Sequence, residues 1–256
     1  MAFLCWSPDE LPTAYRFGHD SMTAGDADID SAQRREFLAG CPSTALCGLA
    51  VALNAGDALA AGSPSPSGAA RERYPATLLV NERGAPVDSR LLQPRTNYLF
   101  HYPFVATPCL LLDLGRDVGG VGPNRSIVAF SAICSHKLAY PAKEVSFIRF
   151  QAKASTYSEA ERIHCCADHS VYDPAERARV VSGPAPTPLA QVELSYNART
   201  HGLMATGMRG PDQFDAFFRK YEFKLSMDFG GRARELIGKN SHLQELTRFC
   251  RNVAQC

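Results

Sequence analysis

Two pairs of cysteine and histidine residues constrain the fold of this 256-residue chain more than any other feature. Cys134 and His136 stand two positions apart, at the end of the apolar run over residues 126–134. Cys166 and His169 stand three positions apart, about thirty residues later, after another short apolar lead. Thiolates and imidazoles on loops at strand ends are typical metal ligands. The sequence therefore predicts a fold in which two loops meet around a metal centre.

The chain around these pairs has the pattern of an all-β domain. Short runs rich in β-branched and aromatic residues follow one another from about residue 75, separated by Gly, Pro and Asn. Strands of this length and spacing are typical of a sandwich or barrel. The expected strands span residues 76–81, 97–105, 107–114, 126–134, 145–150, 190–197 and 201–208.

One helical segment is expected near the C-terminus, over residues 210–223. Its aromatic residues Phe214, Phe217, Phe218 and Tyr221 recur at offsets of three and four, which is the period of one face of a helix. We expect this face to pack on the core rather than to form a binding stripe.

Charge and cysteine content exclude several classes of protein. The formal net charge is +1, so the chain has neither the basic footprint of a nucleic-acid-binding protein nor a polybasic membrane patch. Nine cysteines are too few for a small disulfide-stapled scaffold of this length. Function must therefore be argued from individual sites.

The first part of the chain has the features of an export leader. Arg34 and Arg35 precede a moderately apolar, Ala-rich stretch, and together they predict a twin-arginine-type signal or anchor over residues 1–61. Residues 62–74 are rich in Gly, Ser, Pro and Arg and predict a flexible linker. The folded body would then span residues 75–256, in the periplasm or at the periplasmic face of the inner membrane. The alternative is that the arginine pair opens an amphipathic helix that packs on this body.

The cysteine and histidine pairs, with the residues that follow them, resemble the fingerprint of the Rieske iron–sulfur family. That fingerprint is C-x-H in one loop and C-x-x-H in another, followed by Ser, an aromatic residue and Asp. The chain has Cys-Ser-His at 134–136, Cys-Ala-Asp-His at 166–169, SVYDP at 170–174 and a Gly-Pro-Ala-Pro loop within 179–196. The resemblance implies an antiparallel β-sandwich with a small cluster-binding subdomain, whose loops lie at about 131–141 and 163–188.

The resemblance also implies one 2Fe-2S cluster and its ligands. Cys134 and Cys166 would bind one iron, and His136 and His169 would bind the other. Because neutral imidazoles donate less charge than thiolates, such a cluster has a higher reduction potential than one with four cysteines.

Two further residues would contact the cluster. Ser170 and Tyr172 stand where family members place hydroxyls that hydrogen-bond a bridging sulfide and a cysteine sulfur. For Tyr172, a buried strand aromatic without such a role is the competing interpretation.

The function that the resemblance implies is one-electron transfer by an exported protein, as a subunit or partner of an oxidoreductase rather than as a self-sufficient enzyme. Its partner would be a c-type cytochrome, a quinol-oxidising complex or a dehydrogenase subunit, and the leader could associate with the membrane. The alternative is a zinc-stabilised β-rich binding module, because the same four ligands could close a structural zinc site.

The chain departs from the family pattern at the loops themselves. Ala139 and Asp168 stand where many members carry a pair of disulfide-forming cysteines, so the loops must be braced by packing, for example by Pro141 and the Gly-Pro-Ala-Pro loop. The family's Gly between the ligand His and the Ser is also missing, since His169 directly precedes Ser170.

The missing glycine leaves the second thiolate ligand open. Counting from His169 selects Cys166, which the thiolate-to-imidazole spacing favours, whereas counting back from the serine selects Cys165. A pairing of Cys250 with Cys256 is a further possibility in an oxidising compartment.

Overall fold

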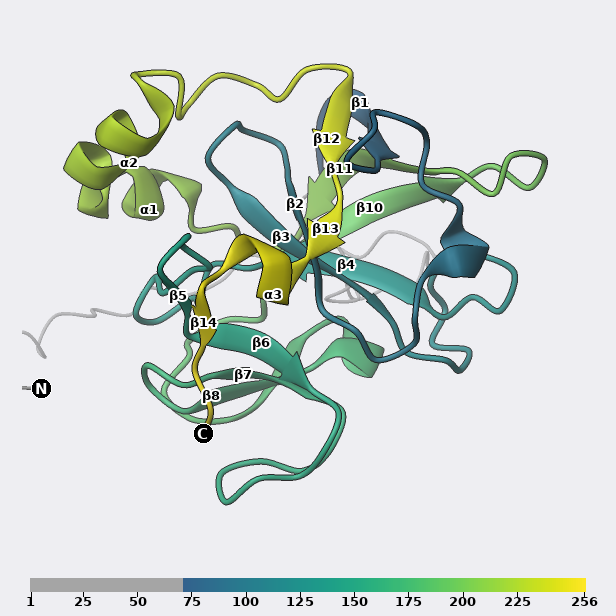
Figure 1. Cartoon of the computed structure of the whole chain (residues 1–256). Coiled ribbons are helices and arrows are strands. Elements are labelled where there is room, and N and C mark those ends of the chain that lie inside the picture. The colour runs from purple at the N-terminus through teal and green to yellow at the C-terminus, as the bar shows by residue number, and fades with distance from the viewer. Residues whose placement is uncertain (1–70) are drawn as a thin grey trace, which may run out of the picture. The chain divides into compact units, whose positions relative to one another are not determined.

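The computed structural model describes residues 71–256, which form a β-rich fold with three short α-helices (Figure 1). The leader predicted over residues 1–61 lies outside the described residues, as does most of the linker predicted over residues 62–74. None of the helices in the described part of the chain is both long and apolar enough to cross a bilayer. The helices are α1 (Phe214–Lys220), α2 (Glu222–Phe229) and α3 (Leu246–Phe249).

The largest element of the fold is an eight-stranded sheet. All of its strand pairs are antiparallel except the pairing of β1 with β12, which is parallel. In spatial order its strands are β12 (Asn240–His242), β1 (Arg71–Val80), β11 (Leu203–Arg209), β10 (Gln191–Tyr196), β4 (Ile127–Ser131), β3 (Pro108–Asp113), β2 (Tyr98–His101) and β13 (Gln244–Glu245).

A smaller antiparallel sheet of four strands carries the second cysteine and histidine segment. It consists of β6 (Ile148–Gln151), β7 (Arg162–Cys165), β8 (Ser170–Asp173) and β9 (Arg179–Ser182). Beside it, β5 (Val145–Ser146) pairs in parallel with β14 (Asn252–Val253), which brings the C-terminus to this sheet. Two 3-10 turns complete the fold, η1 (Ser89–Leu91) and η2 (Pro174–Glu176).

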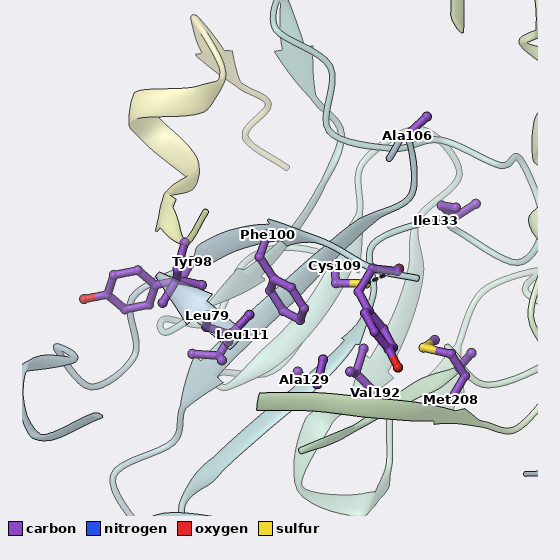
Figure 2. Close-up of a cluster of buried hydrophobic side chains, with 14 of the residues drawn as sticks. Leu79, Tyr98, Phe100, Ala106, Cys109, Leu111, Ala129, Ile133, Val192 and Met208 are labelled. Atoms are coloured by element: carbon purple, nitrogen blue, oxygen red, sulfur yellow. Dashed lines mark hydrogen bonds between the residues drawn. The ribbon is translucent and has the colours of Figure 1, made fainter. Parts of the chain in front are cut away.

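Two hydrophobic cores lie on opposite faces of the central strands, because successive side chains of a strand point to opposite sides. On β3, Cys109 and Leu111 belong to the first core, which also contains Phe100 (Figure 2). Leu110 and Leu112 belong to the second core. The second core also takes Ile148, Phe150, Ile163 and Tyr172 from the smaller sheet. The two sheets therefore pack face to face, and the predicted all-β sandwich with a small subdomain is confirmed.

The helical segment packs on the loop that follows β4. Phe214, Phe217 and Phe218 are buried, which confirms that the aromatic face is part of the core. The Tyr140 ring lies 4.9 Å from the Phe217 ring and 4.8 Å from the Tyr221 ring, measured between centroids, with an edge-on geometry in both cases. The predicted single helix is divided at Tyr221, whose backbone leaves the helical region.

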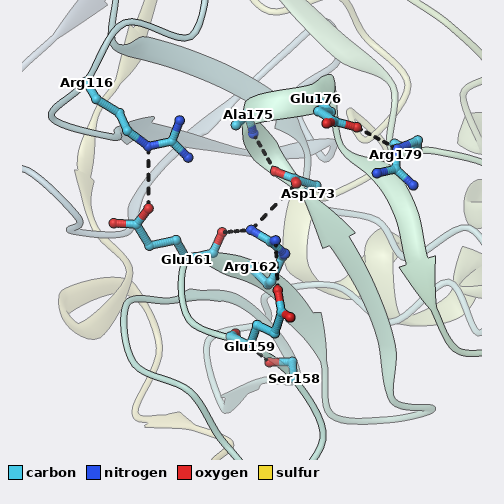
Figure 3. A network of polar contacts seen from close by, with 9 residues as sticks. All are labelled: Arg116, Ser158, Glu159, Glu161, Arg162, Asp173, Ala175, Glu176 and Arg179. Atoms are coloured by element: carbon cyan, nitrogen blue, oxygen red, sulfur yellow. Dashed lines mark hydrogen bonds and ion pairs between the residues drawn. The ribbon is translucent and has the colours of Figure 1, made fainter.

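A polar network holds the end of the smaller sheet that lies away from the second cysteine loop (Figure 3). The Arg162 guanidinium lies 3.1 Å from a Glu159 carboxylate oxygen and 3.5 Å from one of Asp173. The Asp173 carboxylate also accepts the Ala175 N–H at 2.9 Å and so caps η2. Because Arg162 and Asp173 are both largely buried, this network joins the start of β7 to the end of β8.

Candidate metal centre

The first loop of the site begins directly after β4 and turns tightly around Cys134. The Leu138 N–H donates to the Cys134 carbonyl oxygen at 2.9 Å, and the Cys134 N–H donates to the Ala139 carbonyl oxygen at 2.9 Å. Leu138 adopts a positive φ of 58°, which lets the chain reverse over so few residues. The Cys134 side chain is fully buried, whereas the side chain of His136 at the loop tip is 37% exposed.

The second loop is the hairpin between β7 and β8. Cys165 is the last residue of β7 and pairs with Ser170, the first residue of β8. The N–H groups of Asp168 and His169 both donate to the Cys165 carbonyl oxygen, at 3.3 Å and 2.8 Å. His169 has a positive φ of 58°, so it takes the backbone conformation that a glycine would favour at this position. Both loops thus wrap around a buried cysteine.

Four side chains from these loops meet at one point. One ligand atom each from Cys134, Cys165 and Asp168 lies within 4.8 Å of the other two. Asp168 Oδ2 lies 3.2 Å from Cys134 Sγ and 3.0 Å from His136 Nδ1. The site therefore offers two thiols, one imidazole and one carboxylate, and only the imidazole is substantially exposed.

The structure brings together two of the four predicted ligands, Cys134 and His136. The other two, Cys166 and His169, do not join them. Cys166 forms a disulfide with Cys256, so its sulfur is not a free thiolate, and Cys165 takes its place beside Cys134. The choice of Cys166 over Cys165 is therefore corrected.

The physical reason for this correction is the alternation of side chains along β7. His164 and Cys165 are consecutive strand residues, so they point to opposite faces of the sheet. The His164 ring lies 5.7 Å from the His169 ring, and the Tyr157 ring stacks on the other side of His169 at 4.0 Å with an angle of 27° between the planes. His169 and Cys256 thus gather on the His164 face, away from the two free thiols.

Asp168 was absent from the predicted ligands, although a signal for it was present in the sequence. Counting back from Ser170 selects Cys165, and the residue three positions after Cys165 is Asp168. That count keeps the C-x-x spacing, and His169 then takes the position that glycine holds in the fingerprint; its φ of 58° is a conformation that glycine favours.

Ser170 and Tyr172 both belong to β8, the strand that follows the second loop. The Tyr172 hydroxyl lies 3.4 Å from Cys134 Sγ and 3.4 Å from the Ser135 hydroxyl. The Ser170 hydroxyl oxygen is buried and makes no hydrogen bond within residues 71–256. Tyr172 is also fully buried in the second core, so its two predicted roles, as a strand aromatic and as a hydroxyl beside a cysteine, are compatible.

The Gly-Pro-Ala-Pro loop braces both cysteine loops, as expected from the missing cysteine pair. A Cβ atom on Gly183 would lie only 2.5 Å from the His169 carbonyl oxygen and 2.6 Å from Ser170 Cα, so this close approach requires glycine. Four residues further on, the Thr187 carbonyl oxygen accepts a hydrogen bond from the Ser135 hydroxyl at 2.7 Å.

A disulfide supplies a second brace that was not predicted. It joins Cys166 in the second loop to Cys256 at the C-terminus, whereas the suggested partner Cys250 is a buried free thiol. The pairing of Cys250 with Cys256 is therefore wrong. The tail next to the bridge is also held by hydrogen bonds, because the Ala254 N–H donates to the Ser146 carbonyl oxygen at 2.9 Å.

Electrostatics at the site follow from the contact between the thiols. Hydrogen bonding with Cys165 lowers the pKa of Cys134 to about 7, with help from Tyr172 and the N–H groups of the first loop, while the same contact raises the pKa of Cys165. Burial opposes the ionisation of Asp168, but the Ser170 N–H and the two thiols hold the pKa of its carboxyl below the ordinary value. The pKa of Tyr172 is raised by burial and by the neighbouring Cys134.

A hollow of about 330 Å³ adjoins both cysteine loops. Lys137 and Ala167 line it from the two loops, and Lys220, Tyr221 and Lys224 line it from α1 and α2 and the residue between them. The remaining lining residues are mostly apolar: Ala139, Tyr140, Ala142, Val145 and Phe147. The hollow beside the site is therefore lined by apolar and aromatic side chains together with three lysines.

Comparison with known proteins gave two findings. No protein-family model matches the chain. Among solved structures, the chain is similar to the soluble domain of the Rieske protein II (soxF) from Sulfolobus acidocaldarius, with 28% sequence identity and a TM-score of 0.41 over 54% of this chain and 80% of that chain.

Proposed function

We propose that this protein transfers single electrons through a Rieske-type 2Fe-2S cluster held between its two cysteine loops. The observation that carries the proposal is the meeting of two buried free thiols, Cys134 and Cys165, with His136 at the rim. When bound, such a cluster accepts and releases one electron at a potential set by its ligands and hydrogen bonds.

The side chains fit such a cluster in spacing and in chemistry. Two sulfurs that share a tetrahedral metal through bonds of about 2.3 Å lie about 3.8 Å apart, and the Cys134 and Cys165 sulfurs lie within 4.8 Å of each other. The buried hydroxyl of Ser170 has no partner among the described residues, and a cluster sulfide would supply the missing acceptor. Burial of two thiolates beside a carboxylate costs free energy, because the three negative charges are removed from water. A bound metal would neutralise these charges.

The chain's own contribution is to exclude water from one side of the site and to open the other. Cys134, Cys165 and Tyr172 are fully buried, while His136 contacts Asp168 through Nδ1 and has a side chain that is 37% exposed. The exposed edge of His136 would therefore be the route by which the electron enters or leaves. This arrangement supports an electron carrier, or a subunit of an oxidoreductase, more than a self-sufficient enzyme.

The surface around His136 supports a protein partner with an acidic rim. Within residues 71–256, neither Lys137 nor Lys220 forms an ion pair, although the Lys220 ammonium donates to the Lys137 carbonyl oxygen at 2.6 Å; both lie at the hollow beside the loops. Lysines without acidic partners beside a mostly apolar hollow favour fast, salt-dependent association with an acidic docking surface. A c-type cytochrome, a quinol-oxidising complex or a dehydrogenase subunit is the kind of partner that we propose.

We also propose export by the twin-arginine-type leader. The Cys166–Cys256 disulfide is typical of a protein that matures in an oxidising compartment. Cys134 and Cys165 lie near enough to be oxidised together there, unless a metal already occupies them. A route that moves folded, loaded protein would protect the site. Mass spectrometry of the mature N-terminus, with fractionation of wild-type and Arg34→Lys/Arg35→Lys chains, tests this.

The function itself is tested by redox titration of the full-length chain, followed by visible absorption and electron paramagnetic resonance (EPR). We expect a reversible one-electron transition, and oxidation of the reduced protein by a c-type cytochrome at a rate that falls with added salt. The Lys220→Glu variant should keep the same potential and react more slowly with an acidic partner. A chain that shows no redox transition would refute the proposal.

A further inference from the structure

The residue three positions after Cys165 stands at the spacing that the C-x-x-H pattern gives to its histidine. This residue is Asp168, whose side chain is only 2% exposed. A buried carboxylate is stable only when it is paired, hydrogen-bonded or bound to a metal. Within residues 71–256 Asp168 has no lysine or arginine partner, and its only ion-pair contact is His136.

The two oxygens of Asp168 have different surroundings. Oδ1 accepts the Ser170 N–H at 3.0 Å, which fixes the carboxylate to the start of β8. Oδ2 faces Cys134 Sγ at 3.2 Å and His136 Nδ1 at 3.0 Å. One oxygen is thus held by the backbone, and the other is directed at the two groups most expected to bind metal.

The His169 ring has partners other than the two free thiols of the site. It stacks on Tyr157 and approaches His164, and its own loop is tied to the C-terminus by the Cys166–Cys256 disulfide. The ligand atoms of His169 group with those of His164 and Cys256, whereas those of Cys134 group with Cys165 and Asp168. The geometry therefore favours the carboxylate over the imidazole.

We infer that Asp168 is the fourth protein ligand of the cluster, which would be held by two thiolates, one imidazole and one carboxylate. The inference rests on the proposed function and deepens it, because it identifies the ligand that sets the charge of the site. A carboxylate is a hard oxygen ligand that ferric iron accepts readily. Since it is anionic, it stabilises the oxidised cluster and lowers the reduction potential relative to a site with two imidazoles.

The inference is tested by counting the histidine nitrogens that bind the cluster. The full-length protein is produced with ¹⁵N-histidine in an unlabelled background, and pulsed EPR is recorded on the reduced state. We expect one coupled histidine nitrogen in the wild type and in His169→Gly, whose glycine suits the positive φ at this position. Two coupled nitrogens in the wild type, falling to one in His169→Gly, would overturn the inference and leave the proposed function intact.

Substitutions of Asp168 supply a second, independent readout. Asp168→Asn should lose cluster or shift its EPR signal, and Asp168→His should show two coupled nitrogens. The reduction potential of Asp168→His should rise by at least about 59 mV relative to the wild type, which corresponds to a tenfold change in the ratio of oxidised to reduced protein. An unchanged spectrum and potential in Asp168→Asn would overturn the inference alone, whereas wild-type protein with neither iron nor sulfide would overturn the proposed function as well.

Discussion

Removal of the Cys166–Cys256 disulfide is expected to destabilise the fold substantially. The bridge closes a loop with a sequence separation of 90 residues. The chain-entropy relation for such a loop gives about 4.6 kcal/mol at 25 °C. Residual structure in the unfolded chain lowers this value, so we expect the Cys256→Ser variant to lose about 3 to 4.6 kcal/mol in the free energy of unfolding. Urea unfolding without reductant, followed by far-ultraviolet circular dichroism, measures the loss.

Two controls separate the bridge from its surroundings. Gln255→Ala changes the neighbouring exposed residue of the tail, which contacts Arg149, and should cost no more than about 0.5 kcal/mol. The Cys166→Ser/Cys256→Ser double variant should match either single variant, because all three remove the same bond. A loss below about 1 kcal/mol in the single variants, or additive losses in the double variant, would show that the bridge does not stabilise the fold in this way.

Three further predictions concern single residues. Gly183→Ala should lower the free energy of unfolding by at least about 2 kcal/mol, because its Cβ would collide with backbone atoms of the second loop. Gly84 also has a positive φ but open space around it, so Gly84→Ala should cost about 1 kcal/mol in the same urea assay. Equal losses in the two variants would contradict this. Tyr172→Phe should lower the reduction potential by roughly 40 to 60 mV, because it removes a hydroxyl 3.4 Å from Cys134 Sγ. An unchanged potential in a redox titration would show that this contact does not affect the potential. Burial lowers the pKa of His101 from 6.5 to about 4, so the unfolded chain binds the proton more tightly and the free energy of unfolding falls as the pH drops from 6.5 toward 4. His101→Gln should remove about 2 kcal/mol of this fall between pH 7 and pH 4.5. Identical pH profiles of the urea midpoint in the two proteins would count against this prediction.

Much of the fold could be predicted because its central strands are buried on both faces. Such strands appear in the sequence as continuous apolar runs, as over residues 108–113, where five of the six residues are buried. The strands β12, β13 and β14 are only two or three residues long, so no period can form in them. Their existence depends on pairing with partners that are distant in the sequence.

The first cysteine loop was predictable and the second only partly so. Cys134 and His136 follow a strong strand, which fixes their direction from local sequence alone. In the second loop, adjacent cysteines compete, and the register of β7 decides between them by turning Cys165 and Cys166 in different directions. That register depends on the pairing of β7 with β6 and β8, and the disulfide depends on the return of the C-terminus, so neither follows from spacing.

Analysis of iron, zinc and acid-labile sulfide in the full-length protein, together with EPR of the dithionite-reduced state, shows whether the two loops hold a mixed-ligand 2Fe-2S cluster. We expect two irons and two sulfides per chain, and a signal with the low average g value of a cluster that has both thiolate and non-thiolate ligands. A colourless protein with one zinc per chain and no sulfide would contradict this expectation.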